Sequence, residues 1–147
     1  MPALTRNLLL FLLPAAAALA ANSTIASDKP VINFRLPAFT AQGYRAWLVR
    51  GSEARFASPQ QIDVMELTLS IFPGKADNEK VETMILSPTA RVRPDTAVIT
   101  GDKTIRVIND QFEATGTGWR YEHKEKKVSI TRNVRITFRA EFKDILK

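Results

Sequence analysis

From Val31 onward, hydrophobic and polar residues alternate in short runs that are separated by Gly, Pro, Asn and Asp. A period of two residues is typical of a β-strand with one buried face. The longest run, residues 62–72, alternates apolar with polar residues, and its apolar set is Met65, Leu67, Leu69 and Ile71. No run after Val31 shows the period of 3.6 residues that indicates a helix. The pattern therefore predicts a protein built from strands.

Turn-forming residues divide this region into many short strands. Gly51, Pro88 and Gly101 are expected to mark strand ends, and Pro94 to begin a turn at residues 93–96, because proline cannot donate to a strand ladder. The predicted strands are residues 44–50, 53–57, 62–72, 81–87, 89–92, 97–100, 104–108 and 112–115. Short strands at nearly even spacing predict an all-β sandwich, roll or barrel.

The segment from residue 119 to residue 138 predicts a hairpin with a charged tip at 122–127. Trp119 and Tyr121 share one face before the tip. After the tip, apolar residues of equal parity share one face unless a bulge intervenes at 132–133. These residues are Val128, Ile130, Val134, Ile136 and Phe138.

His123, the only histidine, lies in this charged tip. A catalytic base needs a positioned partner and a pocket, so we interpret His123 as a solvated turn residue. The chain contains no nucleophile elbow, paired-histidine zinc motif or Gly-rich phosphate loop. A two-carboxylate enzyme site would have to come from scattered acids, namely Glu53, Asp63, Glu66, Glu82, Asp95 and Asp110. We therefore predict no catalytic residue, no metal site and no cofactor.

A weak internal repeat relates residues 101–108 to residues 131–138. In this repeat Ile105, Arg106 and Val107 match Val134, Arg135 and Ile136. A period of about 30 residues with strand content indicates stacked β-hairpins that share one core.

The N-terminal residues differ from the rest, because Arg6 precedes an apolar run from Leu8 to Ala21. This run is short and contains Pro14, and the small residues around Ala20 fit a signal peptidase site. We predict a signal peptide at residues 1–20, a linker at 21–33 and a β domain at 34–147. The alternative is an uncleaved membrane anchor at residues 7–21.

Composition adds three constraints. The chain has 147 residues, of which 45% are hydrophobic and 24% are charged, which is enough for one domain with a core. It has no cysteine, so an exported form relies on that core without disulfides. The formal net charge of +6 favours an anionic partner without identifying it.

Two segments resemble the OstA-like periplasmic proteins of lipopolysaccharide export. The segment "FEATGTGWRYEHKEKKVSITRNVRI" has the spacing of the OstA-like repeat, with Arg132 where the repeat usually has Gly. The segment "LPAFTAQGYRAWLVRGSEARF" resembles the opening of the LptC branch, through Leu36, Pro37, Phe39, Gly43, Trp47, Gly51 and Ala54. The resemblance covers residues 34–138. Because the N-terminal segment looks cleavable, whereas LptC keeps an anchor, an LptA-like role stays open.

The resemblance implies a twisted antiparallel β-jelly roll in the periplasm that shelters the acyl chains of lipopolysaccharide without catalysis. Its partners would be lipopolysaccharide, other β-jelly roll proteins of the export bridge and an inner-membrane transporter, with no nucleic acid. The expected groove residues are Trp47, Leu67, Leu69, Ile71, Ile85, Ile105, Val107, Phe112, Trp119, Tyr121, Val134, Ile136 and Phe138. The expected partner edge strand contains Val134, Ile136, Phe138, Ala140 and Phe142.

The alternative function is that of a secreted β-sandwich that binds protein or carbohydrate through its loops and has no lipid role. This alternative predicts a sealed core, whereas the lipid hypothesis predicts an open apolar seam. Export and the spread of basic residues over many strands argue against nucleic-acid binding.

Overall fold

The computed structural model describes residues 29–76 and 80–139. The segment predicted as a signal peptide or anchor lies outside the described residues, and so do Ala140 and Phe142 of the predicted partner strand. The described part of the chain holds no helix with the length and apolar character that crossing a bilayer requires.

Seven strands form one antiparallel sheet in which each strand pairs with the next along the chain. They are β1 (Val31–Phe39), β2 (Arg45–Ser58), β3 (Gln61–Ile71), β4 (Thr83–Arg93), β5 (Val98–Asn109), β6 (Phe112–Glu122) and β7 (Lys127–Phe138). β1 begins inside the range predicted as linker. β1 and β7 do not pair, so the sheet is unclosed. This architecture confirms the predicted all-β, twisted β-jelly roll class.

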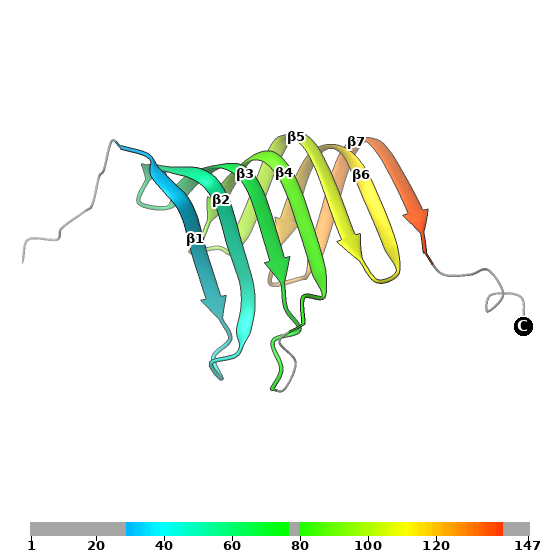
Figure 1. Ribbon diagram of the computed structural model, residues 1–147, viewed down its shortest axis with the longest axis horizontal. Coiled ribbons are helices and arrows are strands. Elements are labelled where there is room, and N and C mark those ends of the chain that lie inside the picture. Colours follow the sequence, from blue (N-terminus) through cyan, green and yellow to red (C-terminus); the bar gives the residue numbers. More distant parts are fainter. Residues whose placement is uncertain (1–28, 77–79, 140–147) are drawn as a thin grey trace, which may run out of the picture.

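Each long strand arches over one side of the molecule, so that the sheet folds back on itself (Figure 1). The fold line divides the sheet into two arms whose inner faces meet. We call arm A residues 34–39, 45–50, 67–71, 83–87, 104–109, 112–116 and 134–138. Arm B comprises residues 53–58, 61–65, 89–93, 98–101, 119–122 and 127–130. Every strand from β2 to β7 runs through both arms, so each of these strands forms part of both walls of the interior.

The fold line passes through residues that the sequence suggested were strand ends. Gly51, Pro88 and Gly101 lie inside β2, β4 and β5, respectively. The strand register is interrupted beside Pro88 and beside Gly101. Four pairs of predicted short strands are therefore single long strands that bend. The expectation that Pro88 ends a strand was wrong. Proline is accommodated there because the ladder is already broken at the bend.

Left-handed residues mark the same line in the remaining strands. Asn33, Glu66 and Asn133 have φ angles of 54°, 52° and 53°. In β3, Glu66 interrupts the two-residue alternation, so the buried parity changes across it. In β3 the inward residues are therefore Ile62 and Val64 before Glu66, and Met65 is 49% exposed. The prediction that Met65 shares a face with the later apolar residues of β3 was wrong for this reason.

Close packing joins the two arms along the fold line. A side chain at Gly101 would place its Cβ 2.3 Å from Nε1 of Trp119, so only glycine fits there. The indole N–H of Trp119 donates to Oγ of Ser87 over 3.1 Å, and Ser87 donates to the carbonyl oxygen of Thr104 over 2.7 Å. Ser87 and Trp119 are buried, so this bond satisfies polar groups that would be costly to leave unpaired.

The core is a set of rows that run across the sheet. In arm A one row takes one inward residue from every strand: Leu36, Val49, Leu69, Ile85, Val107, Ala114 and Ile136. The facing row in arm B is Phe56, Ile62, Val92, Ile99, Tyr121 and Val128. Residues in the middle of both rows are fully buried. Each such Leu, Ile or Val stabilises the fold by roughly 1.5–3 kcal/mol, which is how a domain without cysteine stays folded.

Candidate functional site

The two arms enclose an apolar groove of about 400 Å³ at the β6–β7 end of the roll. Arm A lines it with side chains from β3 to β7, and arm B lines it with side chains from β6 and β7. The lining residues are Ile71, Glu82, Thr83, Val107, Asn109, Phe112, Ala114, Tyr121, Lys126, Val128, Ile130, Val134 and Ile136. Nine of these are apolar or aromatic, so the groove suits an apolar ligand.

The groove is open because no strand follows β7 in the described sheet. Val107 and Ile85 are buried in the middle of the inner row, whereas Ile136 in the same row is 50% exposed. Val134 is also 50% exposed, and Phe138 is 64% exposed. These three residues form a contiguous apolar surface that continues the core. A surface of this kind marks a binding site more often than a solvated face.

The predicted groove residues divide into three groups. Ile71, Val107, Phe112, Tyr121, Val134 and Ile136 line the open groove. Trp47, Leu67, Leu69, Ile85, Ile105 and Trp119 are in the sealed core. Phe138 lies at the rim, where its ring centroid is 6.4 Å from that of Phe112. Alternation identified the inward face correctly, but it could not say which inward residues are covered by other strands. Contact of any of them with lipid stays a prediction.

Sequence analysis left seven lining residues out of the site, two of which, Thr83 and Asn109, are polar strand-end residues. Val128 and Ile130 were assigned to the correct face but not to the groove. Ala114 is small and gives no hydrophobic signal of its own, although its place in the β6 alternation would have found it. Glu82 and Lys126 are charged and looked like loop residues. The available signal was that each lies directly before a strand, since Glu82 precedes β4 and Lys126 precedes β7.

One ion pair spans the mouth of the groove. Nζ of Lys126, in the turn between β6 and β7, lies 3.9 Å from Oε2 of Glu82, which precedes β4. Both side chains are about half exposed, so solvent screens the pair and it contributes little to stability. The mouth is therefore bridged by a contact that is easily broken.

His123 lies at the hairpin end, as predicted, but it is half-buried rather than solvated. Its ring packs edge-on to Trp47, with 6.5 Å between centroids, and its Nδ1 lies 2.9 Å from the hydroxyl of Tyr121. The prediction that His123 is solvated was wrong because aromatic residues of both arms cover the turn and remove its ring from water.

The protonation of this pair follows from its surroundings. Burial lowers the pKa of His123, and the nearby Lys126 lowers it further. Burial raises the pKa of Tyr121 to about 12, with a smaller contribution from Glu82. Both side chains are thus neutral at pH 7, and the tautomer of the imidazole sets which of the Tyr121 hydroxyl and Nδ1 donates in their hydrogen bond. Among the described residues this hydroxyl is the hydrogen-bond partner of His123, whereas a catalytic base would need an orienting carboxylate.

No group of three or more potential metal-ligating side chains occurs within residues 29–76 and 80–139. The acids that sequence analysis considered are instead scattered over the described sheet and its turns, and of these Glu82 lies at the groove. Glu53 and Glu82 form exposed ion pairs, with Arg55 and Lys126.

The last strand has one unpaired edge. Among the described strands β7 pairs only with β6, so within this sheet its opposite edge leaves backbone N–H and C=O groups free for another strand. Val134, Ile136 and Phe138 of the predicted partner strand lie in β7. At the other end of the sheet, Pro37 interrupts the donors of β1, which limits pairing there.

Comparison with known proteins identifies one family. A family model described as "Lipopolysaccharide-assembly, LptC-related" matches residues 17–139. The match includes all seven strands, the groove and the edge of β7. A search of curated proteins finds no match.

Proposed function

Because this chain belongs to the LptC-related family of lipopolysaccharide-assembly proteins, which act in lipopolysaccharide transport, we propose that its open groove shelters lipid A acyl chains. The acyl chains contact the apolar side chains that line the groove, and the head group stays in water at the mouth. The protein performs this role without catalysis.

The observation that carries the proposal is the continuity between the exposed residues of β7 and the buried core. Val134 and Ile136 line the groove together with Val107 and Tyr121, which are buried. An acyl chain placed there would remove apolar surface from water, at about 25 cal/mol per Å². The groove volume of about 400 Å³ lies within the usual range of ligand sites, about 300–1,000 Å³.

The same strand supplies the proposed contact with neighbouring proteins. The free edge of β7 adds to an edge strand of another β-jelly roll, so that the groove continues from one roll into the next. The protein works in the periplasm, exported by residues 1–20 or held at the inner membrane by residues 7–21. Its partners are the inner-membrane transporter and the other rolls of the bridge.

The alternative of a secreted module with a sealed core is less well supported. Such a module would cover the inner face of its last strand, whereas Val134, Ile136 and Phe138 are exposed. The open end is what favours a lipid over a protein or carbohydrate ligand.

A pair of adjacent substitutions tests the groove. Ile136 faces the groove, and Thr137 faces outward on the same strand. We expect Ile136→Glu to weaken the binding of purified protein to lipopolysaccharide at least tenfold, because an acyl chain would have to lie against a carboxylate. Equilibrium binding of fluorescent lipopolysaccharide measures the effect.

Thr137→Glu is the matched control, since it adds the same charge one residue away on the opposite face. It should leave the affinity within about twofold, because an exposed charge outside the groove is screened by solvent. Equal weakening by both substitutions would show that charge alone matters and would contradict the groove assignment.

A further inference from the structure

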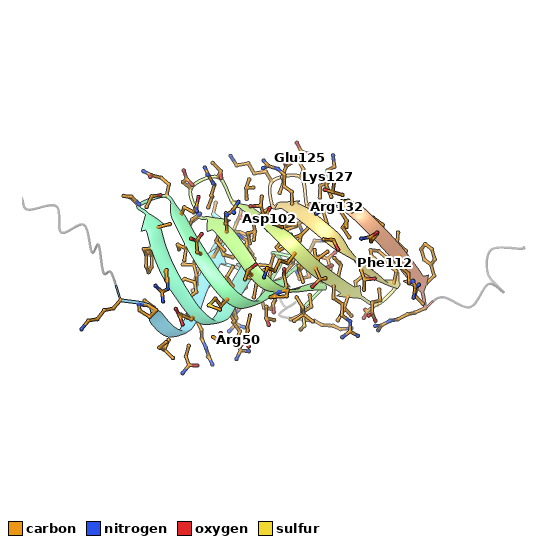
Figure 2. All side chains as sticks on the ribbon, turned by 90° about the horizontal axis from the view of Figure 1, so that it is seen from above. Arg50, Asp102, Phe112, Glu125, Lys127 and Arg132 are labelled. Atoms are coloured by element: carbon orange, nitrogen blue, oxygen red, sulfur yellow. The ribbon has the colours of Figure 1, made fainter. Side chains whose placement is uncertain are left out.

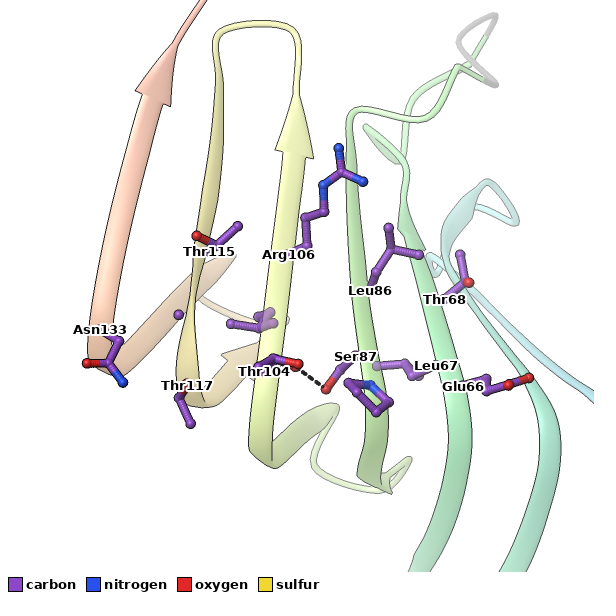
Figure 3. Close-up of a pocket in the computed structure, with 13 residues that line it drawn as sticks. Glu66, Leu67, Thr68, Leu86, Ser87, Thr104, Arg106, Thr115, Thr117 and Asn133 are labelled. Atoms are coloured by element: carbon purple, nitrogen blue, oxygen red, sulfur yellow. Dashed lines mark hydrogen bonds between the residues drawn. The ribbon is translucent and has the colours of Figure 1, made fainter.

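An arginine row crosses the outer face of arm A. The strand register aligns one outward residue from every strand, in the order Arg35, Arg50, Thr68, Leu86, Arg106, Thr115 and Arg135. Four of the seven are arginines. Figure 3 shows the middle of this row, with Thr68, Leu86, Arg106 and Thr115 side by side on neighbouring strands. We call these seven residues the arginine row.

The arginine row lacks the acids that would balance it. Arg35 and Arg50 are directly opposite each other on β1 and β2, and both are exposed. Arg35, Arg50 and Arg135 form no ion pair within the described residues. Like charges placed directly opposite each other in a sheet are destabilising, so folding does not explain the Arg35–Arg50 pair.

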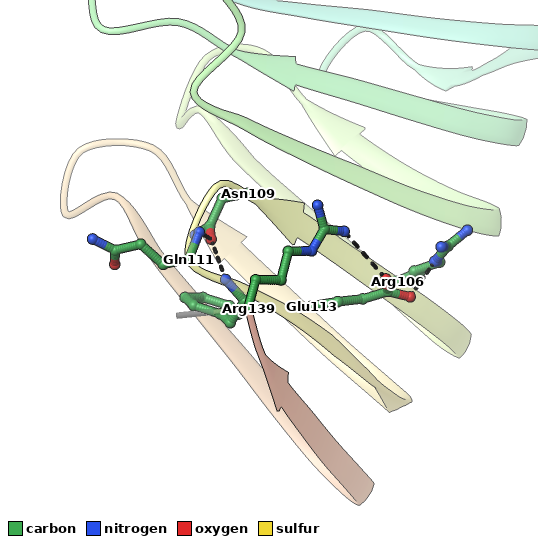
Figure 4. A network of polar contacts seen from close by, with 6 residues as sticks. Arg106, Asn109, Gln111, Glu113 and Arg139 are labelled. Carbon is green, nitrogen blue, oxygen red and sulfur yellow. Dashed lines mark hydrogen bonds and ion pairs between the residues drawn. The ribbon is translucent and has the colours of Figure 1, made fainter. Parts of the chain in front are cut away.

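Arg106, the remaining arginine of the row, shares the carboxylate of Glu113 with Arg139. Glu113 accepts from Nε of Arg106 over 2.5 Å and from Nη2 of Arg139 over 3.4 Å (Figure 4). Arg106 lowers the pKa of Glu113, first through this hydrogen bond, and Arg139 lowers it further. One carboxylate thus faces two guanidinium groups, and the outer face of arm A keeps an excess of positive charge.

The outer face of arm B is an internal reference, because most of its arginines are ion-paired. Arg55 lies 2.9 Å from Glu53, and Arg91 lies 3.0 Å from Asp102. Arg120 pairs with Glu122 on the same strand. Arg93 donates to the amide oxygen of Gln61 and forms no ion pair within the described residues, so three of the four arginines of arm B are ion-paired. In the arginine row only one of the four is. Figure 2 shows Arg50 projecting from one side of the roll, while Glu125 and Lys127 lie toward the other.

Two adjoining hollows accompany the arginine row. One, of about 680 Å³, lies over β3 to β7, and the other, of about 610 Å³, lies over β1 to β3. Hydroxyl and amide groups line them beside the arginines: Asn33, Ser52, Thr68, Thr104, Thr115, Thr117 and Asn133. Guanidinium groups with hydroxyl and amide donors are the groups that bind phosphate oxygens. Glu66 is the one carboxylate that lines these hollows, and its negative charge would repel an anion there.

We propose that the arginine row binds the phosphate head groups of an anionic phospholipid surface. With strands spaced about 4.8 Å apart, the row extends over roughly 29 Å along the sheet, which is far more than one head group occupies. The row contains no aromatic residue, although aromatic anchors are typical of protein interfaces and of single-stranded nucleic-acid sites. Leu86 in its centre suits the apolar margin of a bilayer surface. This site is on the opposite face from the groove and does not depend on the proposed function.

Vesicle sedimentation with the full chain tests the inference. Vesicles of phosphatidylcholine are compared with vesicles that also contain phosphatidylglycerol, at low and at high NaCl concentration. We expect a preference of at least tenfold for the anionic vesicles at low salt, and loss of this preference at high salt because of screening.

Two double substitutions with equal charge change localise the site. Each basic residue near an anionic surface contributes about fivefold to partitioning, so Arg35→Gln with Arg50→Gln should reduce binding to anionic vesicles roughly 20-fold. Arg55→Gln with Arg91→Gln also removes two positive charges but should reduce binding less than about threefold. Glu66→Gln should increase binding. Thermal unfolding of each variant verifies that it folds.

Several results would overturn the inference. One is equal binding to both kinds of vesicle, and another is an equal loss of binding in the two double variants. Tighter binding to an acidic peptide such as polyglutamate than to the anionic vesicles would assign the row to a protein partner instead.

Discussion

At the scale of single residues, the least expected feature is the neutral pair formed by His123 and Tyr121 at the groove. Sequence reasoning placed His123 in solvent because its neighbours in the chain are charged. Its neighbours in space are Tyr121, two residues away, and Trp47 on β2, whose approach the local sequence does not reveal. Burial of a titratable ring links its protonation to the stability of the fold.

This linkage gives a prediction with a defined sign. The folded-state pKa of His123 is below its ordinary value of about 6.5, so the unfolded chain takes up a proton more readily. The stabilising contribution is fully present above about pH 6.5 and is lost as the pH falls toward the folded-state pKa. We expect His123→Gln, which keeps an acceptor for the Tyr121 hydroxyl, to show a smaller loss of unfolding free energy between pH 7.5 and pH 5.

Urea unfolding of both proteins at the two pH values measures this difference. All other titrating groups are common to the two proteins, so the difference isolates His123. If the unfolding free energies of wild type and variant decrease equally over this range, His123 is not desolvated in solution.

At the scale of elements, the strands are longer than local sequence signals indicate. Gly51, Pro88 and Gly101 carry the signals of strand ends, but at these positions the chain bends and continues into the facing arm. A glycine in a turn and a glycine that makes room for Trp119 look alike in sequence. The all-β class, the inward faces and the hairpin tip at 123–126 could be predicted because they depend on local alternation. The fusion of strands depends on pairing between segments and could not.

The register also explains the internal repeat that the sequence suggested. Val107 and Ile136 lie in one inner row, and Arg106 and Arg135 lie in one outer row. The repeat therefore corresponds to two alternate strands of arm A with equivalent inward and outward residues.

The edge of β7 makes a prediction at the same scale. The chain has no cysteine, so Thr137→Cys in β7 introduces a single thiol. Paired antiparallel strands have Cα atoms about 4.5–5.5 Å apart, which suits a disulfide. We expect this thiol to form a disulfide with cysteines placed along an edge strand of a partner β-jelly roll. Non-reducing electrophoresis detects the adduct.

Lys103→Cys is the control for edge pairing, because Lys103 is exposed in the central strand β5. It should form little adduct under the same oxidation. Comparable adducts from both positions would show that the two rolls collide at random rather than pair along β7.

At the scale of the whole molecule, the roll is closed at one end and open at the other. At the closed end, Phe34 of arm A packs against Phe56 of arm B, with 6.3 Å between ring centroids. At the open end, Val134, Ile136 and Phe138 remain exposed. Sequence alternation assigns the same inward role to residues at both ends. What distinguishes them is that the arms pack against each other at the β1 end and leave Val134, Ile136 and Phe138 exposed at the β7 end, which is a property of the assembled fold.

This polarity separates the two proposed surfaces as well. The groove opens between the arms, whereas the arginine row lies on the outside of arm A. An acyl chain and a phospholipid surface could therefore be bound at the same time, by opposite faces of the same strands.

Site-specific photo-crosslinking to labelled lipopolysaccharide in cells tests the central claim most directly. A photoreactive residue replaces Val134 or Ile136 on the inner face, and Ser129 or Thr137 on the outer face, in separate variants. The proposed groove predicts lipopolysaccharide adducts from positions 134 and 136 and none above background from positions 129 and 137. Absence of adducts at both inner positions, or equal adducts on both faces, would contradict the account.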